Sequence, residues 1–169
     1  LDSEKMLSGK MELKLEALDL GSIVQRSIGA NEGFSATHGV SMRFDAGAER
    51  LVVRADADRL AQVVTNLLSN ACKFSPRGGT VDLVLARADG RARLEVSDRG
   101  PGVPAEFRAH LFERFARSDG SDARRAGGTG LGLNICSGII ERLGGSIAHA
   151  ERLGGGSTFY FELPLAEPA

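Results

Sequence analysis

The sequence predicts an α+β fold, a two-layer sandwich in which helices lie on one face of a mixed, mostly antiparallel sheet. Two observations lead to this prediction. Residues 56–74 repeat apolar side chains at the spacing of an amphipathic helix, whereas residues 80–97 alternate apolar and polar side chains on either side of a turn. Further segments of both kinds follow one another along the chain, and antiparallel strands with helices between them are typical of this architecture.

The helix predicted between residues 57 and 74 has the clearest pattern. Asp56 precedes it as an N-cap, Asp58 places negative charge in its first turn, and Pro76 follows its end. Seven apolar residues at i, i+3 and i+4 spacing form one continuous face, which we expect to lie in the core. They are Leu60, Val63, Val64, Leu67, Leu68, Ala71 and Cys72.

The remaining elements follow from the same two periodicities. Asp19 is expected to cap a helix through residues 20–37, and Asp89-Gly90 is expected to turn a hairpin between residues 78 and 98. The other predictions are the frayed end of a helix at 1–8, short strands at 11–20, 40–46 and 51–55, a loop at 99–130 with a short helix at 105–115, a helix at 131–143, and strands at 146–152 and 157–165.

Length and composition indicate one soluble globular domain. The 169 residues suffice for a single core, and 42% apolar with 25% charged residues is ordinary for such a domain. A net charge of −1 gives no field that attracts nucleic acid, so we expect no nucleic-acid partner. Without a membrane-spanning run, a signal peptide or an initial Met, the sequence is expected to be a fragment of a longer protein. Cys72 and Cys136 are expected to be buried free thiols of a reducing compartment.

Three polar residues share a second face of the helix at 57–74. Asn66, Asn70 and Lys73 are spaced i, i+4 and i+7 and therefore project from one side. One interpretation is a solvated face, where Asn and Lys are common. The other is a site in which an Asn oxygen holds a cation beside a lysine that meets phosphate.

A strand end followed by glycines forms the second candidate feature. Asp98 ends the predicted hairpin, and Gly100 and Gly102 follow it in D-x-G-x-G spacing. A carboxylate at this place can accept a hydrogen bond from an exocyclic amine such as that of adenine, and the glycines let the base approach the backbone. A tight turn closed by a hydrogen bond to the Asp98 side chain is the structural alternative.

Alternating glycines lead into the helix at 131–143. Gly128, Gly130 and Gly132 lack the Cβ atoms that would hold a ligand away, and the N–H groups of a helix N-terminus attract anions. The spacing matches neither a P-loop nor the dinucleotide pattern G-x-G-x-x-G. Together the three features supply one nucleotide site with a base acceptor, a metal ligand, a phosphate-facing lysine and an amide-rich helix end.

Five motifs in this order resemble the boxes of the catalytic, ATP-binding domain of bacterial sensor histidine kinases, part of the wider Bergerat-fold group. NLLSNACKF is similar to the N box, DRGPG to the G1 box and LFERF to the F box. GTGLGL is similar to the G2 box and GGGSTF to the last glycine motif. The resemblance extends from about Asp19 to Leu165 and implies the Bergerat ATP-binding fold.

The resemblance implies a site for ATP and Mg²⁺. It gives Asn70 the role of Mg²⁺ ligand, Lys73 a phosphate contact and Asp98 the recognition of the adenine amine. The implied ATP-binding residues are Asn66, Asn70, Lys73, Asp98, Gly100, Gly102, Phe115, Gly128, Thr129, Gly130, Leu131, Gly132 and Thr158. The implied catalytic residues are Asn66, Lys73 and Arg117.

The same resemblance makes residues 117–128 a mobile lid over ATP. Arg117 is the preferred contact to the γ-phosphate, and Arg124 and Arg125 are either further contacts or part of a solvated basic loop. Phe112 and Phe115 are expected to anchor the base of the lid in the core.

Asn66 bears on the type of reaction. In the hydrolysing relatives similar to gyrase and Hsp90 a Glu at this position activates water, and Asn cannot act as a general base in that way. The substitution favours transfer of phosphate to an imidazole over hydrolysis. The alternatives are a nucleotide-binding pseudokinase or interaction module without phosphotransfer and, less favoured, a Bergerat-fold ATPase.

None of the three histidines resembles the phosphoacceptor of this family. His38, His110 and His149 lack the context of an H-E-x-x-x-P motif and are expected to be structural or at the surface. We therefore expect a cytoplasmic fragment that binds ATP without labelling itself, is monomeric alone, and is homodimeric in the full protein. Its expected partners are a histidine-bearing dimerisation domain of the same protein and a cognate response regulator. The expected divisions are 1–18 for the end of the dimerisation domain with a linker and short strand, 19–166 for the catalytic domain and 167–169 for a tail.

Overall fold

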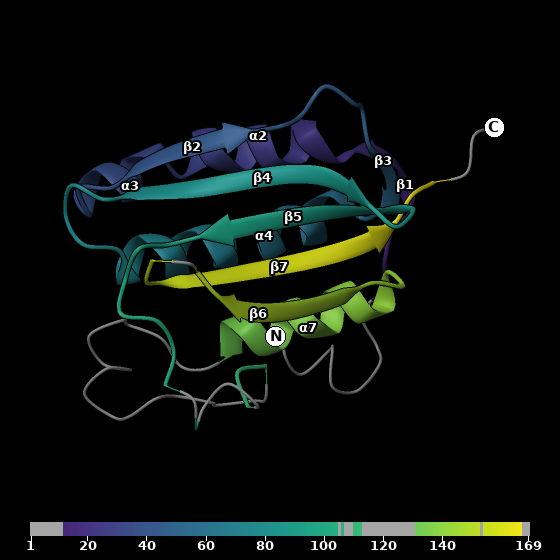
Figure 1. The fold of residues 1–169 in the computed structure, drawn as a ribbon. Coiled ribbons are helices and arrows are strands. Elements are labelled where there is room, and N and C mark those ends of the chain that lie inside the picture. Colours follow the sequence, from purple (N-terminus) through teal and green to yellow (C-terminus); the bar gives the residue numbers. More distant parts are fainter. Residues whose placement is uncertain (1–11, 105, 107–109, 113–130, 153, 167–169) are drawn as a thin grey trace.

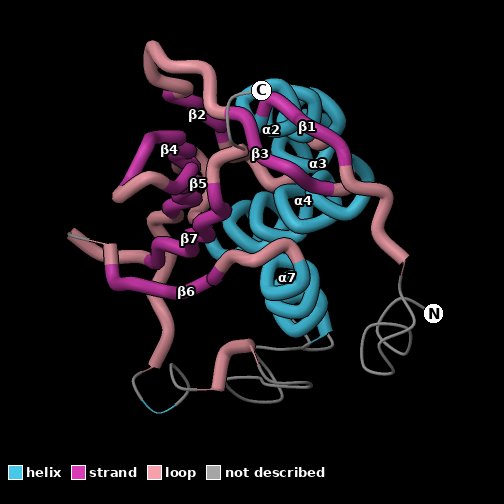
Figure 2. The backbone as a smooth tube through the Cα atoms, turned by 90° about the vertical axis from the view of Figure 1, so that its right-hand side faces the viewer, coloured by secondary structure: helices cyan, strands magenta, loops and turns pink. Residues whose placement is uncertain are grey.

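The computed structural model describes residues 12–104, 106, 110–112, 131–152 and 154–166. The helices are α2 (Leu20–Ala30), α3 (Glu32–Thr37), α4 (Ala57–Phe74) and α7 (Leu131–Arg142). The strands are β1 (Glu16–Asp19), β2 (Ser41–Asp45), β3 (Val52–Ala55), β4 (Thr80–Ala88), β5 (Arg91–Ser97), β6 (Ser146–Glu151) and β7 (Ser157–Pro164). The main sheet forms one layer, and α2, α4 and α7 cover one of its faces (Figures 1 and 2). This arrangement confirms the predicted α+β fold class.

The main sheet has the strand order β2-β4-β5-β7-β6. The β2–β4 pair is parallel and the other three pairs are antiparallel, so the sheet is mixed and mostly antiparallel. Its register places Leu85, Leu94, Phe161 and Ile147 in one row across four strands, on the face that the helices cover. Burial of each such side chain contributes roughly 1.5–3 kcal/mol, so the apolar row stabilises the contact between the two layers.

Helix α4 forms the centre of the helical layer, between α2 and α7 (Figure 2). All seven residues of its predicted apolar face are buried, which confirms that prediction. The Asp56 carboxylate caps the helix, since its Oδ1 accepts a 3.1 Å hydrogen bond from the Arg59 N–H. The helix ends at Phe74, two residues before Pro76.

The helix predicted through residues 20–37 is two helices. Asp19 caps the first as predicted, since its Oδ1 accepts from the Gly21 N–H at 3.1 Å. The prediction of one continuous helix is wrong at Asn31, where the backbone leaves helical geometry between α2 and α3. The Asn31 amide donates to the Ser27 carbonyl oxygen at 2.7 Å and to Thr65 Oγ1 at 3.3 Å. This side chain therefore satisfies a carbonyl at the end of α2 and joins the break to α4.

Strands β1 and β3 form a separate two-stranded antiparallel sheet, whereas the sequence predicts a single sheet. The strand predicted at 11–20 is shorter than expected, because β1 begins only at Glu16. Just before β1, the Lys14 N–H donates to Asp56 Oδ2 at 2.9 Å. The carboxylate that caps α4 thus also holds the segment that leads into β1.

The C-terminal half follows the prediction closely. Asp89 (φ 51°) and Gly90 (φ 76°) both have left-handed backbone geometry, as a tight hairpin turn between β4 and β5 requires. Helix α7 and strands β6 and β7 lie within a residue or two of their predicted bounds. Cys72 and Cys136 are buried free thiols, as predicted. Within the described part of the chain, no helix is both long and apolar enough to cross a membrane.

Candidate nucleotide-binding site

Asp98 lies directly after β5 and is only 3% exposed. Its Oδ1 accepts hydrogen bonds from the Gly100 N–H at 2.9 Å and the Ser157 N–H at 3.2 Å. Burial raises the pKa of this carboxyl, while the two amide hydrogen bonds and the charge of Arg152 act in the opposite direction. Among the described residues Oδ2 has no hydrogen-bond partner, so this oxygen can accept from a ligand.

The Asx turn proposed as the structural alternative is present, because the bond from the Gly100 N–H to Asp98 Oδ1 closes it. This bond uses one oxygen of the carboxylate. The turn leaves the other oxygen, Oδ2, for a ligand, and the two interpretations of the D-x-G-x-G pattern are therefore compatible.

Close backbone contacts hold three segments together around Asp98. A Cβ atom on Gly100 would overlap the Phe74 carbonyl oxygen at the end of α4, and one on Gly156 would overlap the Asp98 carbonyl oxygen. Gly156 also has φ +104° and Gly102 has φ +81°, values that side-chain-bearing residues rarely adopt. The glycines thus join the end of α4, the turn after β5 and the β6–β7 connection.

The polar face of α4 is directed toward the start of α7. Asn66 Nδ2 donates to the Gly132 carbonyl oxygen at 3.4 Å and contacts Cys136 Sγ at 3.6 Å. Burial raises the pKa of the Cys136 thiol to about 12, so the thiol stays protonated at neutral pH. A solvated face does not describe Asn66, whose amide braces α4 against α7. Asn70 and Lys73 lie one and two turns further along and are half-buried.

The structure places the other predicted site residues as follows. The Thr158 Oγ1 lies 2.8 Å from Ser97 Oγ, on the sheet face away from the helices, and thus apart from the Asp98 carboxylate. Leu131 begins α7, but its side chain is outside the described residues. The same holds for all of Phe115, Arg117, Arg124, Arg125, Gly128, Thr129 and Gly130.

Two of the remaining predictions concern ring contacts. Phe112 packs edge-on against Phe159 with ring centroids 6.2 Å apart, as expected for an anchor in the core. His38 Nδ1 donates to the Phe34 carbonyl oxygen at 3.0 Å, and His149 packs on Phe159. Both histidines therefore have structural contacts, as predicted.

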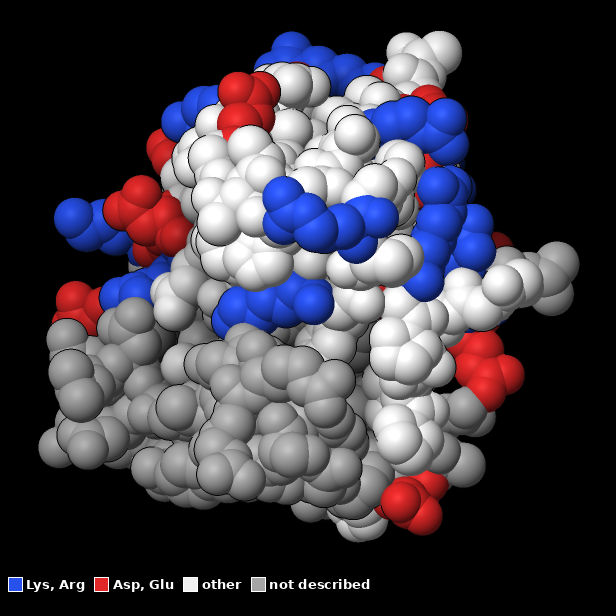
Figure 3. Space-filling model, turned by 90° about the vertical axis from the view of Figure 1, so that its left-hand side faces the viewer, with Lys and Arg blue, Asp and Glu red and all other residues white. Residues whose placement is uncertain are grey.

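Phe74 is a residue of this region that sequence reasoning missed. The residue is 43% exposed, although its carbonyl oxygen lies against Gly100 beside Asp98. The signal was available, because Phe74 is a large apolar residue outside the apolar stripe of α4. Figure 3 views this end of the molecule and shows Lys and Arg side chains interspersed with Asp and Glu side chains.

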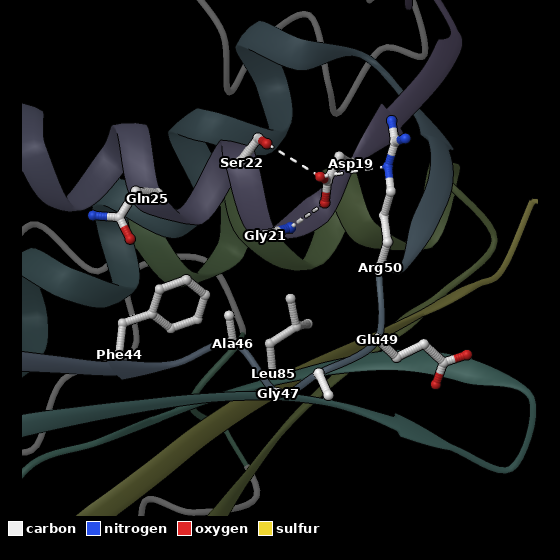
Figure 4. A pocket seen from close by; sticks show the side chains of 11 residues that line it. Asp19, Gly21, Ser22, Gln25, Phe44, Ala46, Gly47, Glu49, Arg50 and Leu85 are labelled. Atoms are coloured by element: carbon white, nitrogen blue, oxygen red, sulfur yellow. Dashed lines mark hydrogen bonds and ion pairs between the residues drawn. The ribbon is translucent and has the colours of Figure 1, made fainter.

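A hollow of about 340 Å³ lies at the opposite end of the sheet, between α2 and the β2–β3 connection (Figure 4). Phe44, Ala46 and Leu85 form its floor, and Asp19 and Arg50 stand at its edge. Asp19 is used here in capping α2 and pairs with Arg50 at 3.5 Å. The groups expected to bind a nucleotide are not part of this hollow.

Several known proteins with similar sequences are histidine kinases. The family described as "Histidine kinase-, DNA gyrase B-, and HSP90-like ATPase" matches residues 55–167. The hybrid signal transduction histidine kinase D of Dictyostelium discoideum is 35% identical over 98% of this chain and 11% of its own length. The circadian input-output histidine kinase CikA of Synechococcus elongatus is 36% identical over 99% of this chain and 23% of its own length. The chain thus spans less than a quarter of either relative.

Solved structures give the same result. Full-length ShkA in complex with AMPPNP has a TM-score of 0.85 and 31% identity over 99% of this chain and 35% of its own. The catalytic domain of histidine kinase ThkA has a TM-score of 0.78 and 29% identity over 89% of this chain and 95% of its own. ThkA in complex with the response regulator TrrA has a TM-score of 0.78 and 26% identity over 98% and 46%. The chain therefore belongs to the histidine kinase-, DNA gyrase B- and HSP90-like ATPase family and has the fold of a histidine kinase catalytic domain.

Proposed function

We propose that this chain is the Mg-ATP-binding part of a sensor histidine kinase and supplies the γ-phosphate to a histidine on an adjacent dimerisation domain. The observation that carries the proposal is the buried Asp98 carboxylate, which has one oxygen fixed by two backbone amides and the other available. The similarity to ShkA, which was solved in complex with AMPPNP, supports an adenine nucleotide as the ligand.

Base recognition is the step for which the described residues give most detail. The exocyclic amine of adenine donates to Asp98 Oδ2, while Oδ1 stays bound to the Gly100 N–H. Phe74, whose carbonyl oxygen lies against Gly100, has an exposed side chain, and we assign it as a surface on which the base stacks. An acceptor of this kind selects adenine over guanine, which has a carbonyl oxygen in place of the amine.

Phosphate binding involves the second half of α4 and the start of α7. Lys73 faces the phosphates, and the N–H groups at the start of α7, near Gly132, are available to an anion at the positive end of the helix dipole. We assign Arg117 to the γ-phosphate. Gly128, Thr129, Gly130 and Leu131 belong to the same glycine-rich approach to α7 in the sequence.

The residues fit Mg²⁺ as a partner of the phosphates. Mg²⁺ commonly takes one or two protein oxygens together with phosphate and water oxygens, and Asn70 offers one amide oxygen beside Lys73. The described residues contain no cluster of three His, Cys, Asp or Glu side chains that would hold a metal ion by themselves. When bound, Mg²⁺ neutralises charge on the phosphates during transfer.

Asn66 favours transfer to a histidine over hydrolysis of ATP. Its amide nitrogen is engaged with Gly132 and Cys136, and an amide has no basic group that could take a proton from water. The attacking imidazole of an acceptor histidine is itself a nucleophile and needs no such base. A pseudokinase without phosphotransfer is not favoured, because Asp98, Asn70 and Lys73 all have the residue types that the reaction requires.

The remaining assignments concern the whole protein. We assign residues 1–18 to the end of the dimerisation domain and the linker, 19–166 to the catalytic domain and 167–169 to a tail. The full protein acts as a homodimer on the cytoplasmic side and passes phosphate to a response regulator, while the fragment is a monomer. The structure of ThkA in complex with a response regulator supports a response regulator as a partner.

Calorimetry with the present chain tests the proposal. ATP and ADP are titrated with and without Mg²⁺, and GTP serves as the control for base recognition. We expect ATP to bind more tightly with Mg²⁺ and GTP to bind at least tenfold more weakly, because it cannot donate to Asp98. A histidine-bearing dimerisation domain supplied separately should then accept phosphate. Absence of ATP binding under both conditions would contradict the proposal.

A further inference from the structure

A line of polar residues crosses the outer face of the main sheet directly behind the Asp98 turn. The strand register sets Arg43 of β2 beside Asp82 of β4, and Asp82 beside Ser97 of β5. Asp82 Oδ1 accepts from Arg43 Nε at 3.1 Å. Its Oδ2 accepts from Arg99 Nη2 at 3.0 Å. One carboxylate therefore holds two arginines, one on each of its oxygens.

Arg99 is the residue between Asp98 and Gly100. Its backbone N–H donates to Ser75 Oγ at 3.5 Å, and its side chain reaches back past Ser97 to Asp82. The side chains of Asp82 and Arg99 are only 24% and 35% exposed, whereas that of Arg43 is 71% exposed. The Arg99 guanidinium is thus held in a partly buried ion pair on the sheet face opposite the helices.

Asp98, the preceding residue in the chain, offers this guanidinium an alternative partner. Asp98 is a buried carboxylate whose Oδ2 has no hydrogen-bond partner among the described residues. Arginine binds carboxylates through several N–H groups at once, and the pair is stronger where water is excluded. An Arg99 side chain released from Asp82 would therefore compete with the adenine amine for the same oxygen.

We propose that Asp82 is a positioning residue that holds Arg99 on the outer face of the sheet and so keeps the Asp98 carboxylate open to the base. This inference rests on the proposed function, because it assumes that Asp98 recognises adenine. Arg99, the second residue of the D-x-G-x-G turn, would therefore block the site if Asp82 on β4 did not hold it.

Three variants test the inference by ATP titration. Asp82→Asn removes the charge that holds Arg99 and should weaken ATP and ADP about tenfold, as expected when a charged pair competes for the acceptor. Asp82→Asn combined with Arg99→Gln removes the competitor as well, so affinity should return to within about twofold of the wild type. Arg43→Gln, which removes the other arginine on the same carboxylate, is the matched control and should leave affinity unchanged.

The recovery distinguishes positioning from a loss of stability. If Asp82 only stabilised the sheet, the double variant would bind as weakly as Asp82→Asn or more weakly, and that result would overturn the inference. Unchanged affinity in Asp82→Asn would overturn it as well, and the melting temperature of each variant shows whether the chain is folded. Failure of the wild type to bind ATP would overturn the proposed function and this inference with it, whereas normal wild-type binding with no effect of Asp82→Asn overturns the inference alone.

Discussion

Asp98→Asn separates the function of the buried carboxylate from its structural role. The amide oxygen of Asn has the same position as Oδ1 and can still accept from the N–H groups of Gly100 and Ser157. The change is confined to the second oxygen, where an NH₂ group replaces Oδ2. A donor then faces the exocyclic amine of adenine, which is also a donor.

The expected loss follows from the bonds involved. A hydrogen bond to a charged group contributes about 1.5–3 kcal/mol, so ATP and ADP should both bind roughly tenfold to a hundredfold more weakly. The free energy of unfolding of Asp98→Asn should rise or stay the same. Burial raises the pKa of Asp98, which means that the folded state disfavours the charged carboxylate, and Asn removes that charge.

The assay combines calorimetric titration of ADP with thermal unfolding of the same samples. Asp89→Asn is the matched control, because it makes the same chemical change in the exposed hairpin turn, where Asn tolerates left-handed geometry. The control should match the wild type in both measurements. An unchanged ADP affinity in Asp98→Asn would refute the role of Asp98 in base recognition. A large loss of melting temperature would refute the claim that Oδ1 alone carries its structural role.

Four further outcomes are expected. Gly155 and Gly156 both have φ values that would strain an alanine, at a cost of roughly 1–3 kcal/mol. Gly156→Ala should nevertheless lower the melting temperature more than Gly155→Ala, because only the Cβ at Gly156 overlaps the Asp98 carbonyl oxygen. Equal losses would contradict this. Phe74→Ala should weaken the binding of ATP and ADP alike, by about tenfold if the base stacks on the ring. The melting temperature should change little, because Phe74 is 43% exposed. A loss of affinity for ATP alone would argue against stacking. Asn70→Ala should reduce the effect of Mg²⁺ on ATP affinity, and a wild-type response in Mg²⁺ titrations would exclude Asn70 as a ligand. Nucleotide affinity should fall as the pH falls through the raised pKa of Asp98, since the acceptor is protonated there, and a flat profile would contradict this. The same raised pKa has the opposite sign for folding: its contribution to stability is present below the unfolded pKa and is lost as the pH rises through the folded value.

The sequence predicts best those elements whose signal is local. The apolar face of α4, its Asp56 cap and the Asp89-Gly90 turn each depend on neighbouring residues, and the structure confirms all of them. The break at Asn31 was not predictable in this way, because it involves a contact with Thr65, 34 residues away. The separate pairing of β1 with β3 likewise depends on residues far apart in the chain.

The same distinction applies to the candidate site. The D-x-G-x-G pattern was sufficient to predict a turn closed by the Asp98 side chain, since that hydrogen bond is local. The contact of Asn66 with Cys136 depends on how two helices pack, which spacing within one helix does not reveal. The outward position of Thr158 follows from strand alternation with Phe159 and Phe161, a signal that the family resemblance outweighed.

The Asp56 carboxylate joins the start of α4 to the segment before β1, because it accepts from the Lys14 N–H on one oxygen and from the Arg59 N–H on the other. The helix has 18 residues and is therefore about 27 Å long. Its first turn is fastened to the segment before β1, and Asn66, Asn70 and Lys73 lie along its second half. A helix is stiff along its axis, so a displacement of the segment at Lys14 would move the first turn of α4 and, with it, the second half of the helix.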